Sequence, residues 1–239
     1  MSDVSNTMSQ NDVDTYDYAD NYDPNKVEVE EVINAVFAID CSGSISPCVK
    51  DLNNALNEFT ERMQKSHAKD KLFVSRVDFN SVIEVAHGFK PISELQTVDL
   101  GTKVNGPHSG STKLYEGVKT ALKNALDYRA SLEQGGINVK TLLFIITDGE
   151  DNASSSGSAA EVKKMIADLQ REERNIFSFE SIIFGVGSSG DFQLAQRDMN
   201  IHHLAQVGTT ADEIRKMIAF ISSSVTSVST GGGVSAPTF

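Results

Sequence analysis

The chain has 239 residues, of which 39% are hydrophobic and 23% are charged, a composition typical of a globular protein with one main domain. Its net charge of -12 argues against nucleic acid as a partner, since binding to a phosphate backbone needs clustered Lys and Arg. No apolar run approaches the roughly 18 residues of a membrane span, and the N-terminus has no signal-peptide pattern. We therefore expect a cytoplasmic protein with no membrane partner.

The two ends of the chain differ in composition from the middle. Residues 1–25 have few aliphatic side chains and no Lys or Arg, so they cannot bury enough apolar surface to order themselves. The aspartates of this segment are Asp3, Asp12, Asp14, Asp17, Asp20 and Asp23. We predict an acidic disordered arm over residues 1–29, a single domain over 30–222, and a Ser/Thr/Gly-rich tail over 223–239.

In chain order, the first predicted strand is the apolar run Ile33–Ile39. Ser46 and Pro47 follow as an N-cap and a first-turn proline, and they predict a helix that runs to about Met63. Two further strands, 72–79 and 82–86, are separated only by a short turn at Asn80 and Ser81. A turn this short predicts a hairpin, so this pair is expected to be antiparallel.

The second half of the chain continues the alternation of strands and helices. Ser158 with Glu161, and Thr210 with Glu213, have the spacing of capping boxes that open helices. The predicted elements are a helix over 114–126, a strand over 141–147, a helix from 158, a strand over 179–186, a weak strand over 203–207 and a last helix from 210. The expected fold class is α/β: a doubly wound, mostly parallel six-stranded sheet with one antiparallel edge strand and helices on both faces.

Polar side chains stand where two of these strands end. Asp40, Ser42 and Ser44 follow the first strand, and Asp148 follows the strand over 141–147. Thr112 is placed in a loop immediately before a helix. In such sheets ligands bind beyond the carboxyl ends of the strands, and carboxylate and hydroxyl oxygens suit Mg²⁺, Mn²⁺ or Ca²⁺. The sequence therefore predicts a metal site at this edge.

The segment Asp40-Cys41-Ser42-Gly43-Ser44, then Thr112, then Thr147-Asp148-Gly149 resembles the metal-ion-dependent adhesion site of the von Willebrand factor A domain. The resemblance covers about residues 30–222. It implies a Rossmann-like fold and Mg²⁺ (or Mn²⁺ or Ca²⁺) held by five side chains, with a partner protein's Asp or Glu completing the coordination. The five implied ligands are Asp40, Ser42, Ser44, Thr112 and Asp148.

The ending "EIRKMIAFISSSVTSVS" is similar to small bacterial von Willebrand A proteins associated with tellurium resistance. This second resemblance implies a stress-response, defence or signalling assembly of a bacterium or phage, with a kinase or phosphatase acting alongside.

Two functions follow from such a metal site. One is a metal-dependent protein-interaction module with no enzymatic activity, and the other is a metal-assisted, phosphatase-like hydrolase. A hydrolase needs a general base, for which Glu150 is the only nearby candidate apart from the metal-bound acids. Glu150, Asp151 and Asn152 have three readings: they bond to the inner ligands, form an acidic rim, or belong to a plain turn. Cys41 and Cys48 fit neither a redox pair nor a zinc site, and we expect reduced thiols.

Overall fold

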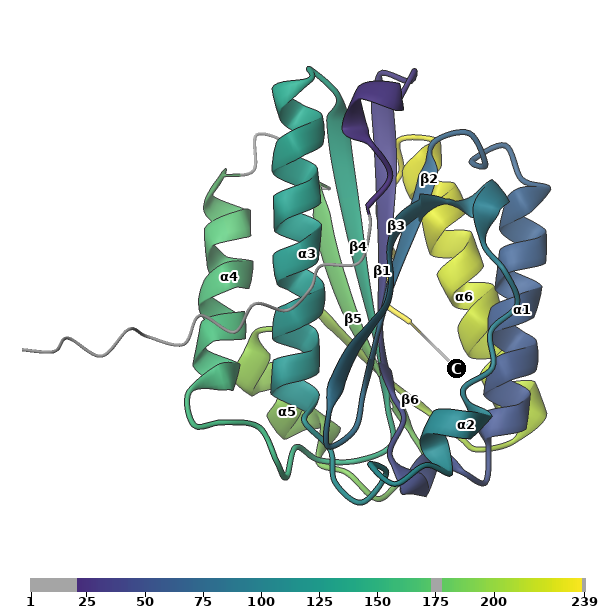
Figure 1. Cartoon of the computed structure of the whole chain (residues 1–239), viewed down its shortest axis with the longest axis vertical. Helices are drawn as coiled ribbons and strands as arrows, with labels where there is room; N and C mark the ends of the chain where they lie inside the picture. The colour runs from purple at the N-terminus through teal and green to yellow at the C-terminus, as the bar shows by residue number, and fades with distance from the viewer. Residues whose placement is uncertain (1–20, 173–177, 238–239) are drawn as a thin grey trace, which may run out of the picture.

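The computed structural model describes residues 21–172 and 178–237, and it contains one six-stranded sheet with the strand order β3-β2-β1-β4-β5-β6 (Figure 1). The strands are β1 (Glu31–Asp40), β2 (Leu72–Phe79), β3 (Ile83–Pro91), β4 (Asn138–Thr147), β5 (Phe179–Val186) and β6 (His203–Val207). All neighbours pair in parallel except β2 and β3, which are antiparallel. The predicted α/β fold, with its antiparallel edge strand, is confirmed.

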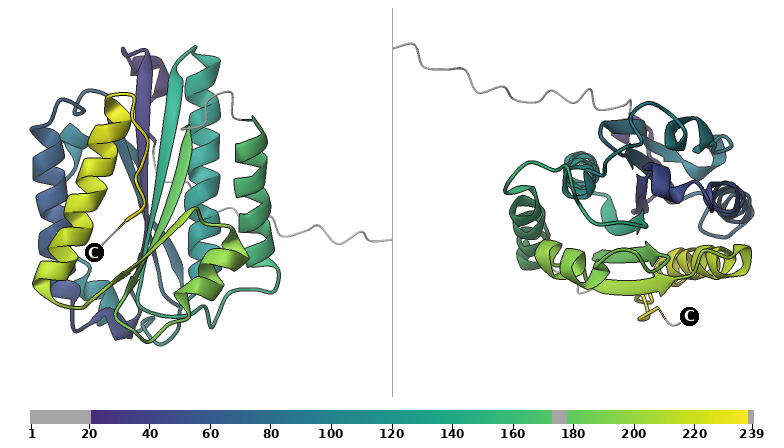
Figure 2. Two further views of the ribbon diagram at one scale, coloured as in Figure 1. Left: turned by 180° about the vertical axis from the view of Figure 1, so that it is seen from behind. Right: turned by 90° about the horizontal axis from the view of Figure 1, so that it is seen from below.

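Helices cover both faces of the sheet (Figure 2). The helices are α1 (Val49–Gln64), α2 (Gly101–Val104), α3 (Leu114–Gln134), α4 (Ser158–Glu172), α5 (Phe192–Met199) and α6 (Ala211–Ser229), and the short 3-10 turns are η1 (Pro24–Lys26), η2 (Gly43–Ile45) and η3 (Ile92–Glu94). Helices α1 and α6 pack together on one face, while α3, α4 and α5 lie on the other. None of the helices that the structure describes is both long and apolar enough to cross a membrane.

The central strands are buried on both sides, which explains their nearly continuous apolar sequence. In β1, Ile33 and Phe37 face the cluster under α1 and α6, whereas Val32 and Val36 face the cluster under α3 and α4. Successive side chains of a strand point to opposite faces, so one strand supplies both cores. The two cores hold the sheet rigid, and its carboxyl edge becomes a fixed platform for loops.

Local signals in the sequence predicted some helix starts better than others. The capping box of Thr210 and Glu213 is present at the start of α6. Helix α1 instead begins at Val49 with Cys48 as its N-cap. Ser158 is already the first residue of α4, and the N–H of Glu161 donates to the carbonyl of residue 157. Helix α4 therefore begins at the residue predicted to be its cap, one residue earlier than expected.

Both predicted chain ends need correction where the structure describes them. The arm was predicted to be disordered through residue 29, but Tyr22 packs its ring on Phe73 at a centroid distance of 5.6 Å, and its N–H donates to the Phe89 carbonyl. Residues 1–20 of the predicted arm lie outside the described residues. At the other end, α6 continues to Ser229, past residue 222. The segment has no charge, which is typical of a tail, but it forms helix and buries one face with Ser224, Val225 and Val228.

Candidate metal centre

The predicted ligands are gathered by the sheet at the carboxyl ends of β1 and β4, the lower end in Figure 1, which the right-hand view of Figure 2 faces. Strands β1 and β4 are neighbours, with Ile39 opposite Ile146. Asp40 ends β1, and Asp148 follows β4 directly. Parallel strands in this register bring their last residues to one point of the edge, so two carboxylates far apart in sequence meet there.

Asp40 is fixed by hydrogen bonds to both of its carboxylate oxygens. The backbone N–H of Ser42 donates to Oδ1 at 2.8 Å, and the hydroxyl of Thr147 donates to Oδ2 at 2.7 Å. The sequence motif contains Thr147, but the sequence did not predict its role as the residue that orients Asp40. Only the pairing of β1 with β4 places its hydroxyl against that carboxylate.

The two serines connect the two carboxylates. The hydroxyls of Ser42 and Ser44 lie 3.0 Å apart, and the Ser44 hydroxyl donates to Oδ1 of Asp148 at 2.9 Å. Ser44 lies in the short 3-10 turn η2, which follows Ser42 directly. The hydrogen bond from the Ser42 N–H to Asp40 fixes the start of this turn. Four of the five predicted ligands therefore form one hydrogen-bonded chain, which we call the Asp40 cluster: Asp40, Ser42, Ser44 and Asp148.

The fifth predicted ligand, Thr112, is brought to this edge by its backbone. Its N–H donates to Oδ1 of Asn152 at 2.8 Å, and its carbonyl accepts the N–H of Asn152 at 3.0 Å. The same loop reaches the Asp40 cluster through the N–H of Gly43, which donates to the carbonyl of Ser109 at 2.8 Å. The loop that carries Thr112 is thus hydrogen-bonded to both segments that carry the other predicted ligands.

The acidic residues after β4 anchor backbone. Oδ1 of Asp151 accepts the N–H of Tyr115 in the first turn of α3 at 3.2 Å. Glu150 accepts the N–H of Asp191 at 3.0 Å through Oε1. Of the three readings of residues 150–152, bonding to a predicted ligand describes only Asn152, whose partner is Thr112. Asp151 bonds to the start of α3, and Glu150 bonds to the loop before α5. An Asp/Asn/Ser-rich stretch beside a helix start is the signal that could have indicated this role.

Burial sets the electrostatics of the Asp40 cluster. The exposed fractions of Asp40 and Asp148 are 0% and 7%. Desolvation raises the pKa of Asp40 to about 6, against the hydrogen bonds from Ser42 and Thr147, and the nearby Asp148 adds to the rise. Desolvation also raises the pKa of Asp148, against the hydrogen bond from Ser44. Within the described residues, no Lys or Arg forms an ion pair with either carboxylate.

These donors fit a hard divalent cation. Two carboxylates and hydroxyls offer only oxygen, which Mg²⁺, Mn²⁺ and Ca²⁺ prefer, and two uncompensated buried charges match a charge of +2. No three His, Cys, Asp or Glu side chains gather as a metal-binding group in the part of the chain that the structure describes. Any metal here would therefore depend on the hydroxyls as much as on the acids.

The two cysteines near the site are free and buried. Burial raises the pKa of the Cys41 thiol, and it raises the pKa of Cys48 to about 11. A thiol is nucleophilic, and binds metals, only as the thiolate. Both thiols are therefore protonated at neutral pH in the metal-free protein, and neither belongs to a group of metal-binding side chains among the described residues.

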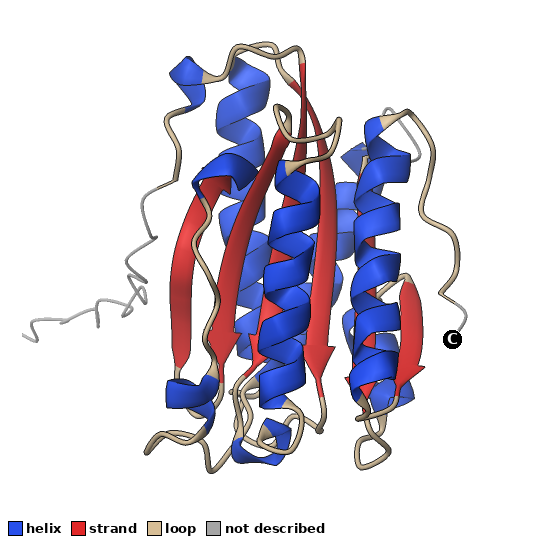
Figure 3. Ribbon diagram, turned by 90° about the vertical axis from the view of Figure 1, so that its right-hand side faces the viewer, coloured by secondary structure: helices blue, strands red, loops and turns tan. Residues whose placement is uncertain are grey.

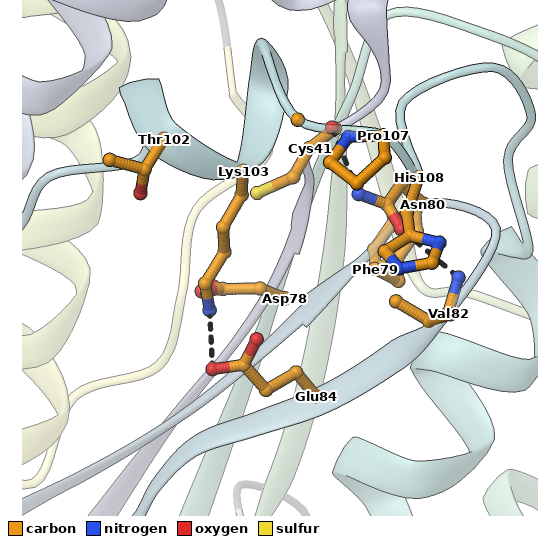
Figure 4. A pocket seen from close by; sticks show the side chains of 11 residues that line it. Cys41, Asp78, Phe79, Asn80, Val82, Glu84, Thr102, Lys103, Pro107 and His108 are labelled. Atoms are coloured by element: carbon orange, nitrogen blue, oxygen red, sulfur yellow. Dashed lines mark hydrogen bonds and ion pairs between the residues drawn. The ribbon is translucent and has the colours of Figure 1, made fainter.

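A recess lies on each side of the Asp40 cluster. The smaller one, with a volume of about 180 Å³, is lined by Cys41, Asp78, Val82, Lys103 and His108 among others (Figure 4). In it Lys103 bonds to Asp78 and lies 2.9 Å from Glu84, and Arg76 contacts Asp78 at 3.0 Å. The positive charges of Arg76 and Lys103 therefore balance the negative charges of Asp78 and Glu84. This network binds α2 to β2. The loop that carries Thr112 follows α2, so the network also anchors the start of that loop.

The second recess is a groove of about 790 Å³ over the ends of β4, β5 and β6. It shares Ser44 and Asp148 with the Asp40 cluster and extends to Glu213 in the first turn of α6. The loops that surround this edge are visible at the lower end of the sheet in Figure 3. The candidate metal position is therefore bordered by open surface, which a second molecule can contact.

A family model described as the von Willebrand factor type A domain matches residues 34–230. A search of curated proteins found no match. Among solved structures, proximal thread matrix protein 1 from the mussel byssus is similar with a TM-score of 0.56 and 14% identity, covering 82% of this chain and 48% of that one. Another structure of that protein has a zinc-occupied MIDAS motif.

A von Willebrand factor type A protein from Catenulispora acidiphila has a TM-score of 0.56 and 12% identity, covering 83% of this chain and 43% of that one. The pilus adhesin SpaC from Lactobacillus rhamnosus GG, in its open conformation, has a TM-score of 0.58 and 13% identity, covering 83% and 30%. The chain thus spans about half or less of the length of these proteins. At such identities the likeness concerns the fold alone.

Proposed function

Because this chain belongs to the von Willebrand factor type A domain family, we propose that it is a protein-interaction module that holds a divalent cation at the Asp40 cluster and binds a partner's carboxylate through that ion. One observation carries the proposal. Asp40 and Asp148 are two buried carboxylates joined through serine hydroxyls, with no Lys or Arg paired to either among the described residues. A stable fold rarely leaves such charges without a cation.

The residues have distinct parts in this proposal. The hydroxyls of Ser42, Ser44 and Thr112 would bind the ion, and the carboxylates of Asp40 and Asp148 would supply the balancing charge. Because Mg²⁺ takes six oxygens and readily keeps waters, this set leaves coordination positions to water or to a second molecule. When bound, the ion would supply a Lewis-acidic position for an external carboxylate.

The competing function is a metal-assisted hydrolase. It needs a general base within hydrogen-bond reach of a metal-bound water. The acids next to the site are already engaged as acceptors, Glu150 by the N–H of Asp191 and Asp151 by Tyr115 and Ser154. These contacts favour the binding module. Turnover of chromogenic phosphate esters or carboxylic esters with Mg²⁺, lost in Asp148→Asn, would instead favour the hydrolase.

The setting we propose for this module is a stress-response, defence or signalling assembly of a bacterium or phage, with an associated kinase or phosphatase. It rests on the similarity of the C-terminal sequence to tellurium-resistance proteins and on no contact in the structure. Affinity capture with wild-type protein and with Asp40→Asn, compared in Mg²⁺, tests it. If the partners that only the wild type recovers include no kinase and no phosphatase, that result would count against this setting.

The proposed binding is tested by selection from a random peptide library with the full-length chain, in Mg²⁺ and in EDTA. We expect the selected peptides to contain Asp or Glu, and to be retained in Mg²⁺ but not in EDTA. Asp148→Asn should lose them, whereas Asp70→Asn, which changes an exposed carboxylate in the turn before β2, should keep them. Peptides without any acidic residue, or peptides retained equally in EDTA, would contradict the proposal.

A further inference from the structure

The groove over β4, β5 and β6 opens directly from the candidate metal position. Ser44 and Asp148 belong to its lining, and so does Glu213 in the first turn of α6. The turns that follow β5 and β6 supply its floor, which consists mainly of small residues: Gly187, Ser188, Ser189, Gly208 and Thr209. A molecule bound to the metal through a carboxylate would therefore have its neighbouring residues over this groove.

The floor of the groove is held by hydrogen bonds. The N–H of Gly187 donates to the carbonyl of Val207 at 2.7 Å, and the Gln206 side chain donates to the Gly187 carbonyl at 3.0 Å. Gly187 has a φ of +81°, which favours glycine. The hydroxyl of Ser189 donates to the Asp148 carbonyl at 2.7 Å. A fixed floor of small side chains suits an extended backbone.

Glu213 is fixed as firmly as the floor. Its Oε2 accepts both the N–H and the hydroxyl of Thr210, while the Thr210 hydroxyl accepts the Glu213 N–H. Gly208 lies so close that a Cβ on it would clash with Oε2 of Glu213. Hydrogen bonds from Thr210 lower the pKa of Glu213, so this carboxylate is charged at neutral pH. Its second oxygen, Oε1, accepts none of these hydrogen bonds.

The charges along the groove leave an unmatched negative end. A divalent cation would balance Asp40 and Asp148, and none of the described residues that line the groove is Lys or Arg. The N-terminus of α6 contributes about half a positive charge, which the full charge of Glu213 exceeds. Lys216 attracts Glu213 from the next turn of α6 but does not line the groove. A bound carboxylate adds further negative charge, so the complementary group is a cation.

Resting on the proposed function, we propose that the preferred ligand is an extended polypeptide segment in which the metal-binding Asp or Glu is separated by a few small residues from a Lys or Arg that lies over Glu213. The metal selects the acid, the small floor selects an extended spacer, and Glu213 selects the cation. The site thereby distinguishes a mixed-charge segment from a purely acidic one.

The proposed preference for an acid together with a Lys or Arg disfavours this chain's own aspartate-rich N-terminus as a ligand. Residues 1–20 contain aspartates and neither Lys nor Arg. Such a segment could offer a carboxylate to the metal but no cation to Glu213. The groove therefore favours a partner over self-occupancy by this segment.

The test uses the same random peptide library, selected with full-length wild type, Glu213→Gln and Asp212→Asn in Mg²⁺ at low salt. Glutamine at this position still completes a capping box, so Glu213→Gln removes the charge and keeps the start of α6. Asp212→Asn is the matched control, because its carboxylate belongs to the same helical turn and pairs with Arg215 at 3.0 Å but does not line the groove.

We expect wild-type and Asp212→Asn selections to enrich Lys or Arg at a fixed spacing from the required acid, and Glu213→Gln to lose that enrichment. Individual peptides should bind the wild type about two- to fivefold more tightly with the cation than with Gln in its place, as for an exposed ion pair. The preference should shrink at high salt. An acid requirement without cation enrichment, or enrichment that persists in Glu213→Gln, would overturn this inference and leave the proposed function standing. Peptides with no acid requirement would overturn both.

Discussion

The acids at the two ends of strand β1 have opposite surroundings. At the amino end, Glu31 of β1 meets Lys71 at 3.0 Å and Lys140 at 2.8 Å. Burial works to raise the pKa of Glu31, but the hydrogen bonds from Lys140 and Lys71 outweigh it, and the pKa is lowered. At the carboxyl end of the same strand, Asp40 has no such cation, and desolvation raises its pKa to about 6.

The same lysines at the amino end also hydrogen-bond to the C-terminus of helix α6. Lys71 donates to the carbonyl of Ser229 at 2.6 Å, and Lys140 donates to that of Val228 at 3.2 Å, so the last turn of α6 is bound to the sheet. Glu31, Lys71 and Lys140 thus all have partners within the protein, which is the arrangement expected of a stabilising ion-pair network. At the carboxyl end, the Asp40 cluster holds acids and hydroxyls with no Lys or Arg paired to them among the described residues. Under the proposed function, this difference separates a structural end of the molecule from a binding end.

The largest expected effect is on metal binding. Asp40→Asn and Asp148→Asn each remove one of the two charges that balance the ion, and we expect either to weaken Mg²⁺ binding by about 100-fold or more, beyond what loss of an outer partner costs. Thermal unfolding measures this, because Mg²⁺ should raise the Tm of the wild type. Asp70→Asn should respond like the wild type. If Mg²⁺ raised the Tm of Asp40→Asn as much as that of the wild type, the proposed distinction between the two ends would be contradicted.

The next effect is a pH dependence of the metal-free protein. The pKa of Asp40 is 3.8 in its unperturbed state and about 6 in the fold, so the folded state binds more protons between these values. Stability should therefore fall as pH rises from about 4 to 6, by on the order of 3 kcal/mol at about 1.4 kcal/mol per unit. Asp40→Asn should lack this fall. Denaturant unfolding across that pH range in EDTA checks it, and identical pH profiles for the two proteins would contradict it.

Breaking the amino end should have a smaller effect, and on stability alone. Glu31→Gln leaves Lys71 and Lys140 without their shared carboxylate, and because the pair is only half buried we expect a loss of about 1–2 kcal/mol. Glu58→Gln, which removes an exposed i,i+4 pair with Arg62, should cost at most about 0.5 kcal/mol. Urea unfolding of both variants measures the difference. Loss of Mg²⁺ binding in Glu31→Gln would show that the two ends are coupled.

The smallest effect concerns the N-terminal residues. Deleting residues 1–20 should leave the Tm and the metal-dependent peptide affinity nearly unchanged, because the packing described for this end begins with Asn21 and Tyr22. Peptide titrations in Mg²⁺ at fixed ionic strength compare the two forms. Tighter peptide binding after the deletion would mean that these aspartates do occupy the metal site.

The sequence predicted what depends on the individual strands and on where they end. Apolar runs with two-sided burial predicted the parallel sheet, and an acid directly after each of two such runs predicted that Asp40 and Asp148 meet. The orienting roles of Thr147 and Asn152 depend on which strands and loops are neighbours, which the sequence does not fix locally. The end of α6 was misplaced because the uncharged serines and threonines after residue 222 look like a tail, although Ser222, Ser224 and Val225 are buried in the helix.

The central claim is that an external carboxylate reaches a cation at the binding end. Mn²⁺ in place of Mg²⁺ allows this to be measured with acetate as the stand-in for a partner's side chain, through paramagnetic broadening of the acetate methyl resonance. With wild type, acetate should be broadened beyond the level given by the same free Mn²⁺ concentration, and Asp148→Asn should abolish the excess. No excess broadening with wild type, or the same excess with Asp148→Asn, would contradict the account.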